Sequence, residues 1–381
     1  MTADSVIVPG PGAARAALTL IAVGDLQLGD SPTTVGYGFH SRYRGTPLDT
    51  LLTAVAPALA GGEIVFGNLE TTLVSAAAGE RRRGTLQLRG EPSYAGDLRR
   101  AGFTVVNVAN NHAVQHGDAT FHATLATVRA AGIACCGVRG VAPWASEPVL
   151  LPGAGGPVGL LGYCLRPRQY GHAEPPYAEG TAESIRADVE RLRARGAIVV
   201  VSLHWGEEFV PQPSASEVAL GRSIIDAGAA LVLGHHPHVV RPVERYKHGV
   251  IAYSLGNFIG DMVWYPPFRR GAILRCSLND GGVVEATTRT TVLGHDFRPV
   301  LADQDAAAPV ATAALEGLDV DAYAREISLT MRRQRRASYR AALANLPRTP
   351  PAILAQLASD TVHNKVGALA ARLRQRLRSG G

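Results

Sequence analysis

The sequence predicts a layered α/β fold, in which helices pack against β-sheets. From Ala17 to about Val292, short apolar or β-branched runs alternate with longer segments whose apolar residues recur at helical spacing. Four of the longer segments stop directly before a glycine, a residue that readily adopts the backbone conformation that ends a helix. The chain has 381 residues, of which 46% are hydrophobic, so it can bury a large core.

Eight short runs have the composition of strands, because each is rich in apolar or β-branched residues and is bounded by turn-forming or polar residues. In chain order they are residues 18–23, 63–66, 104–109, 158–163, 197–203, 230–234, 249–255 and 271–278.

Five segments between these runs have the spacing of helices. They are residues 48–60, 93–101, 120–131, 182–195 and 217–227. The last four are followed by Gly102, Gly132, Gly196 and Gly228, which we expect to end the helices.

The basic charge of the chain belongs to its C-terminal part. Residues 321–381 contain twelve Lys or Arg and three acidic residues, whereas the net charge of the whole chain is +6. Apolar residues recur at helical spacing there, and most of the last arginines fall outside their stripe, which predicts an amphipathic helix. The stripe consists of Val362, Val366, Leu369, Leu373 and Leu377. We therefore expect a flexible N-terminus at 1–16, a main domain at 17–300 and a basic helical extension at 301–381.

Two roles are open for the extension. Its helix either docks on the main domain or contacts an anionic membrane surface, a nucleic acid or a partner protein. No aromatic residues interleave with the last arginines, which disfavours nucleic acid.

The N-terminal residues lack the basic start, long apolar stretch and cleavage site of a secretory signal. The four cysteines form no Cys-x-x-Cys pair, and we expect buried free thiols. Together these features predict a cytoplasmic protein.

A group of histidines indicates a metal site. Residues 231–240 read LVLGHHPHVV and place His235, His236 and His238 directly after an apolar run and a glycine. Neutral imidazole is the commonest metal ligand among side chains. A histidine cluster at the end of a buried strand costs stability unless something binds it.

Similar polar side chains follow other predicted strands. They are Asp25, Asn68, Glu70, Asn110, Asn111, His112, His204 and Asn257. Taken singly, Asp25 fits a turn, Asn68 or Glu70 a helix cap, and His204 a core histidine. Because ligands bind at the carboxyl ends of strands in open α/β sheets, we expect these residues to converge. Their oxygen and nitrogen donors suit Mn, Fe, Zn or Mg.

Six strings carry a family resemblance. They are GDLQLGD (24–30), GNLETTL (67–73), VANNHAVQHG (108–117), SLHWGEEF (202–209), IIDAGAALVLGHHPHVVRPVE (224–244) and YSLGNFIGD (253–261). In this order they resemble the motifs of the CapA, or poly-γ-glutamate capsule biosynthesis, family, which is similar to the calcineurin-like metallophosphoesterases. The resemblance covers about residues 17–290.

The resemblance implies a four-layer αββα sandwich of metallophosphoesterase type, with the C-terminal helical extension added to it. It also implies one or two divalent metal ions, Mn, Fe or Zn, at the strand ends. The implied metal ligands are Asp25, Glu70, Asn111, His204, His236 and His238.

The resemblance also suggests residues for catalysis and substrate binding. His112 is the implied general acid or electrostatic stabiliser, Glu208 orients His204 or acts as a base, and His235 either takes part in catalysis or packs and orients a neighbour. For contacts with substrate we expect Arg89, Asn68, Asn110 and Asn257; for Arg89, an exposed loop arginine is the alternative.

Several positions depart from the family pattern. Gln27 stands where metallophosphoesterases have a histidine, so a second metal ion is expected to bind weakly or not at all. Gln115, Glu217 and Ala230 replace other usual residues and change the surroundings of the ligands. We expect His116 to lie at the surface or to line a pocket.

Three functions follow. The first is a soluble metal-dependent hydrolase that cuts a phosphoester or an amide of γ-glutamyl or peptide-like type in a small or peptide-like anionic substrate. The second is a non-hydrolytic component of capsule polymer biosynthesis, and the third is an amide-forming or group-transfer enzyme. No phosphate-binding loop is present, and no nucleotide or organic cofactor is expected.

Overall fold

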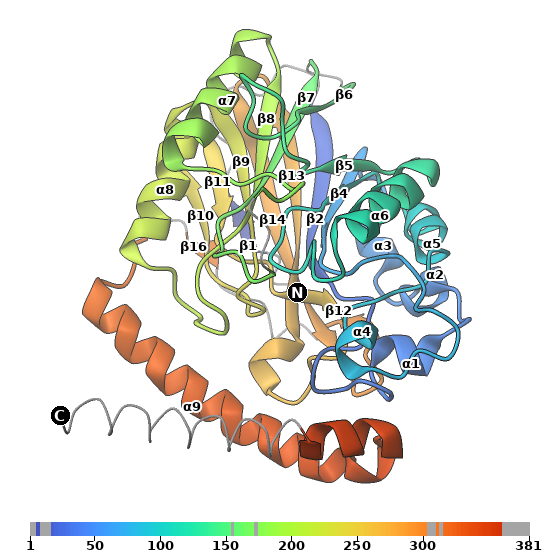
Figure 1. Cartoon of the computed structure of the whole chain (residues 1–381). Coiled ribbons are helices and arrows are strands. Elements are labelled where there is room, and N and C mark those ends of the chain that lie inside the picture. Colours follow the sequence, from blue (N-terminus) through green and yellow to red (C-terminus); the bar gives the residue numbers. More distant parts are fainter. Residues whose placement is uncertain are drawn as a thin grey trace, which may run out of the picture.

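The computed structural model describes residues 5–7, 17–153, 156–170, 174–302, 310–311 and 315–359. Within these ranges the chain forms two β-sheets that lie face to face, with helices on both outer sides (Figure 1). The predicted four-layer αββα sandwich is confirmed.

The first sheet has nine strands among the described residues. Its order is β1 (Ser5–Ile7), β14 (Gly282–Leu293), β13 (Arg270–Asn279), β2 (Leu18–Leu26), β3 (Ile64–Leu69), β4 (Val105–Asn107) and β5 (Ala134–Cys136). In addition, β12 (Asn257–Ile259) pairs with β2 and β15 (Pro299–Leu301) pairs with β14. Strands β2 to β5 run parallel, so their carboxyl ends meet at one edge.

The second sheet has seven strands in the described part of the chain. Its order is β16 (Val310–Ala311), β10 (Val243–Tyr246), β11 (Gly249–Ala252), β9 (Ala229–His235), β8 (Ile198–His204), β7 (Val158–Cys164) and β6 (Val149–Leu151). Strands β7, β8, β9 and β11 run parallel.

Three apolar layers hold the sandwich together. Between the sheets, Leu20 and Phe66 of the first sheet pack with Val200 and Leu231 of the second. The other sides of the same strands face helices, because successive side chains of a strand point to opposite faces. Strand β8 shows this directly: Val200 lies between the sheets and Val199 lies under the helices. The strands are therefore apolar on both faces.

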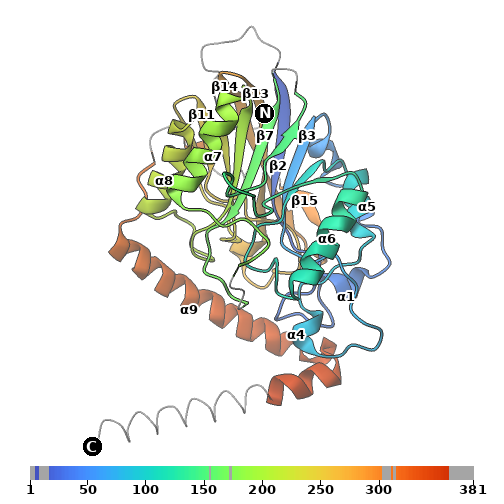
Figure 2. The same ribbon diagram turned by 45° about the horizontal axis from the view of Figure 1, so that its top comes forward.

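The helices are divided between the two outer faces, as Figure 2 shows. The first sheet is covered by α1 (Phe39–Tyr43), α2 (Leu48–Leu51), α3 (Ala56–Leu59), α5 (Tyr94–Arg100) and α6 (Asp118–Ala130), and α4 (Arg83–Leu86) lies in a loop near them. The second sheet is covered by α7 (Ala182–Ala194) and α8 (Ala215–Asp226).

Most predicted elements are found, with two corrections. The predicted helix at 48–60 is wrong as one element, because α2 and α3 are separated by a turn; Pro57, which has no amide hydrogen, interrupts the helical hydrogen bonds. The predicted strand at 249–255 ends at Ala252. Strand β14 was not predicted. Gly102, Gly132, Gly196 and Gly228 all have positive φ, as expected of residues that end helices.

The C-terminal part begins with a long helix, α9 (Val320–Asn345), and continues through the short helix η3 (Leu346–Arg348) to helical residues 351–359. The predicted helix at 362–377 lies outside the described residues. At the other end, Ser5–Ile7 of the predicted flexible N-terminus form β1, which pairs with β14, and the rest of 1–16 lies outside the described residues. The domain limits stay predictions.

Two further expectations can be compared with the structure. All four cysteines are buried and free, as predicted. Within the described ranges, no helix combines the length and the apolar composition that crossing a membrane would need.

Candidate metal centre

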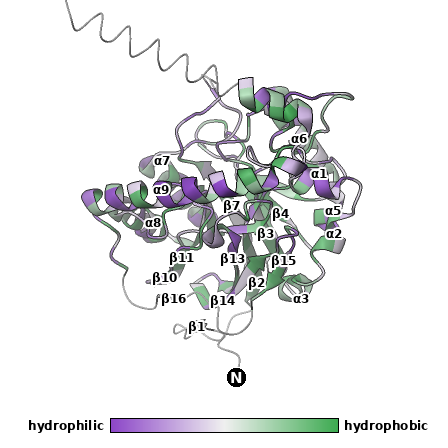
Figure 3. Cartoon of the chain, turned by 90° about the horizontal axis from the view of Figure 1, so that it is seen from below, coloured by the Kyte–Doolittle hydropathy of each residue, from purple (hydrophilic) through white to green (hydrophobic). Residues whose placement is uncertain are grey.

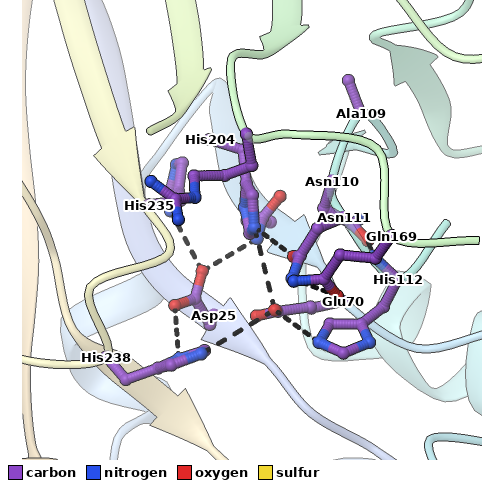
Figure 4. A network of polar contacts seen from close by, with 12 residues as sticks. Asp25, Glu70, Ala109, Asn110, Asn111, His112, Gln169, His204, His235 and His238 are labelled. Carbon is purple, nitrogen blue, oxygen red and sulfur yellow. Dashed lines mark hydrogen bonds and ion pairs between the residues drawn. The ribbon is translucent and has the colours of Figure 1, made fainter. Parts of the chain in front are cut away.

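The carboxyl ends of four parallel strands bring the predicted ligands together, as expected. Asp25 is the next-to-last residue of β2, Glu70 directly follows β3, and His204 and His235 are the last residues of β8 and β9. All of these side chains are buried, and Figure 4 shows them gathered around one point. Residues separated by up to about two hundred positions therefore meet because both sheets place their strand ends at one edge.

The loop after β9 has an unusual backbone. His236 and His238 have φ values of 95° and 56°, in the left-handed region that residues with a side chain rarely adopt. Gly234 precedes them, and a Cβ there would lie 2.3 Å from the backbone oxygen of Tyr253. Strained backbone of this kind is common at functional sites, where the surrounding structure holds it in place.

Glu70 lies at the centre of the cluster. Its Oε1 is 3.8 Å from the Nε2 atoms of His112, His204 and His238. Ligand atoms of Glu70, His236 and His238 lie within 4.8 Å of one another. These three residues form a group that can hold a metal ion.

Asp25 contacts the first and the third histidine of the triplet. Its Oδ2 is 3.1 Å from His238 Nδ1, and its Oδ1 is 3.5 Å from His235 Nδ1. Asn68 Nδ2 donates to Oδ1 at 2.8 Å.

Several buried polar atoms in the cluster lack a hydrogen-bond partner among the described residues. They are both carboxylate oxygens of Glu70 and both ring nitrogens of His236 and of His235. An unpaired buried polar group costs about 1–3 kcal/mol. A divalent cation beside Glu70 and His236 would remove this cost for the atoms that bind it, and carboxylate and imidazole are suitable donors for Mn, Fe or Zn. The residues present therefore fit a metal ion.

Burial and neighbouring charges shift the pKa values of the side chains in the cluster. Burial lowers the pKa of His204 and His236 well below the ordinary range and raises that of Glu70 well above it. Burial also opposes the charged form of His238, but the carboxylates of Glu70 and Asp25 outweigh it and raise the pKa of His238 to about 10. A protonated His238 thus supplies positive charge beside the carboxylate of Asp25.

The pKa of Asp25 is shifted in the opposite direction from that of Glu70, the other buried carboxyl group of the cluster. Burial favours its neutral form, but contacts with His235 and His238 prevail and hold its pKa well below the usual range. The ionised form of Asp25, the form in which a carboxyl group binds a metal ion, is therefore favoured.

Four asparagines form hydrogen bonds with the candidate ligands or with the backbone next to them. Asn111 Oδ1 lies 2.7 Å from His204 Nε2. Asn257 Oδ1 lies 3.0 Å from His238 Nδ1, while its amide donates to the backbone of Phe268. Asn68 holds Asp25, and Asn110 donates to the backbone oxygen of Leu69 and accepts from the amide of His112. Such contacts fix the orientation of metal ligands. Direct contact of Asn68, Asn110 and Asn257 with substrate stays a prediction.

His112 lies at the open side of the cluster, where its side chain is 17% exposed. Burial of most of the ring lowers its pKa to about 4, so the ring is neutral at pH 7. Its Nδ1 is 2.8 Å from Gln115 Oε1, which can only accept. The proton therefore lies on Nδ1, and Nε2 has the free lone pair.

The other two predicted catalytic residues, His235 and Glu208, differ in their burial and their contacts. His235 is fully buried and its ring lies 5.9 Å from that of Phe66, a place from which it can orient Asp25. Glu208 is half-buried, and its negative charge raises the pKa of Glu70 and of His238. Their catalytic roles stay predictions.

Arg89 lies away from the cluster, beside β3 and the loop that carries His116. Its Nη1 donates to the backbone oxygen of Val74 at 3.4 Å, and its buried Nε has no partner in the described part of the chain. His116 is bound to the backbone oxygen of Gln87 at 2.7 Å. Gln27 is buried, and its side chain opposes part of the rise that burial causes in the pKa of Glu70.

The structure adds residues that the sequence did not indicate. Asn107 donates to Asn68 at 2.9 Å, Gln169 accepts from Asn111 at 3.3 Å, and Tyr170 OH lies 3.3 Å from His112 Nδ1. Asn107 could have been found, because it lies in a polar strand end. Gln169 and Tyr170 lie in the loop after β7 and match no motif, so only the tertiary structure reveals them.

Comparison with known proteins identifies the family of the chain. The family described as "Bacterial capsule synthesis protein PGA_cap" has a model that matches residues 19–262, which include the whole cluster. The chain belongs to the PGA_cap family. The predicted family is thereby confirmed.

Two relatives of this PGA_cap chain come from Bacillus. The "Capsule biosynthesis protein CapA" of Bacillus anthracis is 28% identical over 274 residues, which cover 70% of this chain and 65% of that protein. The "PGA biosynthesis protein CapA" of Bacillus subtilis is 28% identical over 220 residues, which cover 57% and 58%. The chain thus spans less than two thirds of the length of these relatives.

A shorter match of the PGA_cap chain is to a "Probable polyglutamine synthesis accessory protein" of Mycobacterium tuberculosis. It is 34% identical over 86 residues, which cover 23% of each protein.

Proposed function

We propose that this PGA_cap chain is a metal-dependent hydrolase that cleaves an anionic substrate at a phosphoester or at an amide of γ-glutamyl or peptide-like type. One observation carries the proposal. Glu70, His236 and His238 are buried with their ligand atoms within 4.8 Å of one another, and the Glu70 oxygens and His236 nitrogens have no hydrogen-bond partner among the described residues. Such a group costs stability unless it binds a cation.

The proposed metal ions are one or two of Mn, Fe or Zn. Glu70, His236 and His238 would hold the first, with Asp25, His204 and Asn111 beside them. A divalent cation there would polarise the scissile group and lower the pKa of a water molecule.

The surrounding side chains supply proton transfer and orientation. His112 lies at the open side of the cluster with its Nε2 lone pair toward Glu70, so this nitrogen can exchange a proton with a substrate. Glu208, half-buried and without a hydrogen bond or ion pair among the described residues, is the proposed base. His235 and Asn68 hold Asp25 in place.

The test combines metal analysis with a substrate panel. The purified protein should contain a transition metal in stoichiometric amount. With Mn²⁺ added, it should hydrolyse one class among a phosphate monoester, a phosphodiester and a γ-glutamyl anilide.

Two variants and a control sharpen this test. Glu70→Gln and His236→Ala should each lose bound metal and lower turnover by about 100-fold or more. His122→Ala changes an exposed histidine on α6 and should keep both. Full turnover in metal-free protein would overturn the proposal.

A second function is favoured by the names of the relatives, which concern capsule, PGA and polyglutamine synthesis. In this case the chain would bind a glutamyl polymer as a component of its biosynthesis without cleaving it. Protein that contains metal, leaves the whole panel intact and still binds poly-γ-glutamate would favour this function over hydrolysis.

A further inference from the structure

Helix α9 presents a row of arginines on its outer face. Arg325, Arg332, Arg333, Arg335, Arg336 and Arg340 are exposed. Among the described residues, none of them has an ion-pair or hydrogen-bond partner. Glu326 is the one acidic residue between positions 325 and 343. The outer face of α9 is therefore strongly positive.

Large apolar side chains lie among these arginines. Leu329 is 41% exposed, Tyr339 67%, Leu343 67% and Leu346, just after the helix, 46%. Positions 329, 333, 336, 340 and 343 follow one another at intervals of three or four, so they form one stripe along the helix. The stripe begins and ends with leucine and has arginines between, a pattern that differs from that of an ordinary solvated helix face.

The opposite face of α9 is fixed to the body of the protein. Tyr323 OH donates to Glu217 Oε2 at 3.0 Å and accepts from buried Arg241 at 3.2 Å. Thr330 is buried, and Met331 packs on the apolar cluster that contains Phe209 and Phe268. The helix therefore cannot rotate to bury its exposed leucines without losing these contacts.

The chain after α9 is fixed as well. Gln356 accepts from the amide of Arg83 at 2.8 Å and donates to the backbone oxygen of Arg81 at 2.7 Å. Figure 3 shows α9 running across the face of the molecule that is seen from below, with polar and apolar residues interspersed along it. The outer face is thus presented as a preformed surface.

We propose that the outer face of α9 binds the surface of an anionic lipid bilayer. Arginines attract anionic headgroups, and their long stems let the charged ends stay at headgroup level while neighbouring apolar side chains enter the acyl boundary. Leucine and tyrosine between the arginines are suited to that boundary.

The exposed apolar residues favour a bilayer over the other polyanions. A glutamyl polymer or a nucleic acid would pair with the arginines but would leave Leu329 and Leu343 in water. A second copy of the same face would bring six arginines against six others. Of these four candidates, the bilayer surface is the one that is complementary to both the charge and the apolar stripe.

Binding in this way would place the metal centre beside the membrane. The inner face of α9 contacts the loop after β8 through Tyr323 to Glu207, and the loop after β9 through Tyr323 to Arg241. These loops carry Glu208, His236 and His238. Met331 packs on the apolar cluster that contains Phe209. The inference does not depend on hydrolysis, since it concerns where the protein is held.

The test measures sedimentation of the full chain with vesicles of phosphatidylcholine and phosphatidylglycerol, mixed roughly seven to three. Each arginine near an anionic bilayer increases partitioning roughly fivefold, so Arg336→Gln with Arg340→Gln should weaken binding about 25-fold. The matched control, Arg186→Gln with Arg289→Gln, removes the same charge from exposed positions on α7 and β14 and should change binding less than about twofold.

A second pair tests the apolar stripe. Leu329→Ser with Leu343→Ser should weaken vesicle binding by about tenfold or more, whereas Val141→Ser with Leu150→Ser, at exposed positions elsewhere, should not. All variants lie outside residues 360–381, so the basic residues of that segment remain in each protein. Urea unfolding of each variant checks that it is folded.

Three outcomes would overturn the proposal. The first is equal vesicle binding by the arginine variant and its control. The second is a general polyanion site: the arginine variant would lose vesicle binding and, equally, binding to soluble poly-γ-glutamate, while the leucine variant would keep its vesicle binding. The third is dimerisation of the wild type that the leucine variant abolishes, without any vesicle binding.

Discussion

Gly206 lies in the loop between His204 and Glu208, and replacing it tests how that loop is held. Its φ is +76°, and a Cβ built there would lie 2.1 Å from Glu217 Oε1 and 2.7 Å from Arg241 Nη1. These two atoms form a buried ion pair of 2.6 Å. Arg241 also donates to the backbone oxygens of Val210 and Glu207, so the pair fixes the loop from both sides.

The expected cost of Gly206→Ala has two parts. An alanine in left-handed backbone costs about 1–2 kcal/mol. Glu217 cannot move aside freely, because its Oε2 accepts from the amide of Ser214 at 2.8 Å and from Tyr323. Separating the buried pair costs about 3–5 kcal/mol, so the total loss of unfolding free energy should be about 4–7 kcal/mol.

The chain offers a matched control. Gly45 has a φ of +78° and no atom within 4 Å of its Cβ position, so Gly45→Ala should cost only about 1–2 kcal/mol. Urea unfolding of both variants gives the difference, and Mn²⁺ titration should show weaker binding for Gly206→Ala alone. Equal destabilisation by the two substitutions would refute the argument that Arg241 and Glu217 hold the loop.

Three other predictions concern the metal centre, α9 and pH. Mn²⁺ at about 100 times its Kd should raise the free energy of unfolding by about 2.7 kcal/mol; His238→Ala should abolish this gain in urea titrations, and an equal gain in the variant would contradict the ligand assignment. Tyr323→Phe removes a hydroxyl bonded to Glu217 and Arg241 and should cost about 1.5 kcal/mol in the same assay; a loss below about 0.5 kcal/mol would show that the contact contributes little. Burial and the nearby carboxylate of Asp30 raise the pKa of Asp261 to about 6 from 3.8. Folding therefore favours its protonated form. As pH rises from about 4 to about 6, the free energy of unfolding of the wild type should fall by up to about 3 kcal/mol relative to that of Asp261→Asn. Parallel pH profiles of the two proteins would contradict this.

Much of the site could be predicted from the sequence because of one physical rule. Parallel strands end at the same edge of a sheet, so polar residues directly after apolar runs converge there. Asp25, Glu70, His204 and His236 were identified in this way, although they are far apart in the chain.

Local sequence was less informative where tertiary pairing decides the structure. The segment Gly282–Leu293 forms a long strand because β13 and β1 pair with it, and Asn257–Ile259 leaves the region of the second sheet to pair with β2 of the first. Pro57 interrupted a segment whose apolar spacing is helical. Gln169 and Tyr170 reach Asn111 and His112 of the cluster only because the loop after β7 folds back onto them.

The sequence by itself determined the fold class, the family and the set of residues that form the cluster, since apolar periodicity and motif order depend only on neighbours along the chain. The family resemblance already names His236 and His238, and not His235, as implied metal ligands, but only the tertiary structure shows what holds the three side chains in different places. His235 is the last residue of β9 and contacts Asp25 and Phe66, whereas positive φ at His236 and His238 turns the backbone so that both join Glu70. That backbone is held by contacts with distant residues, such as Asn257 to His238, and no local pattern encodes it.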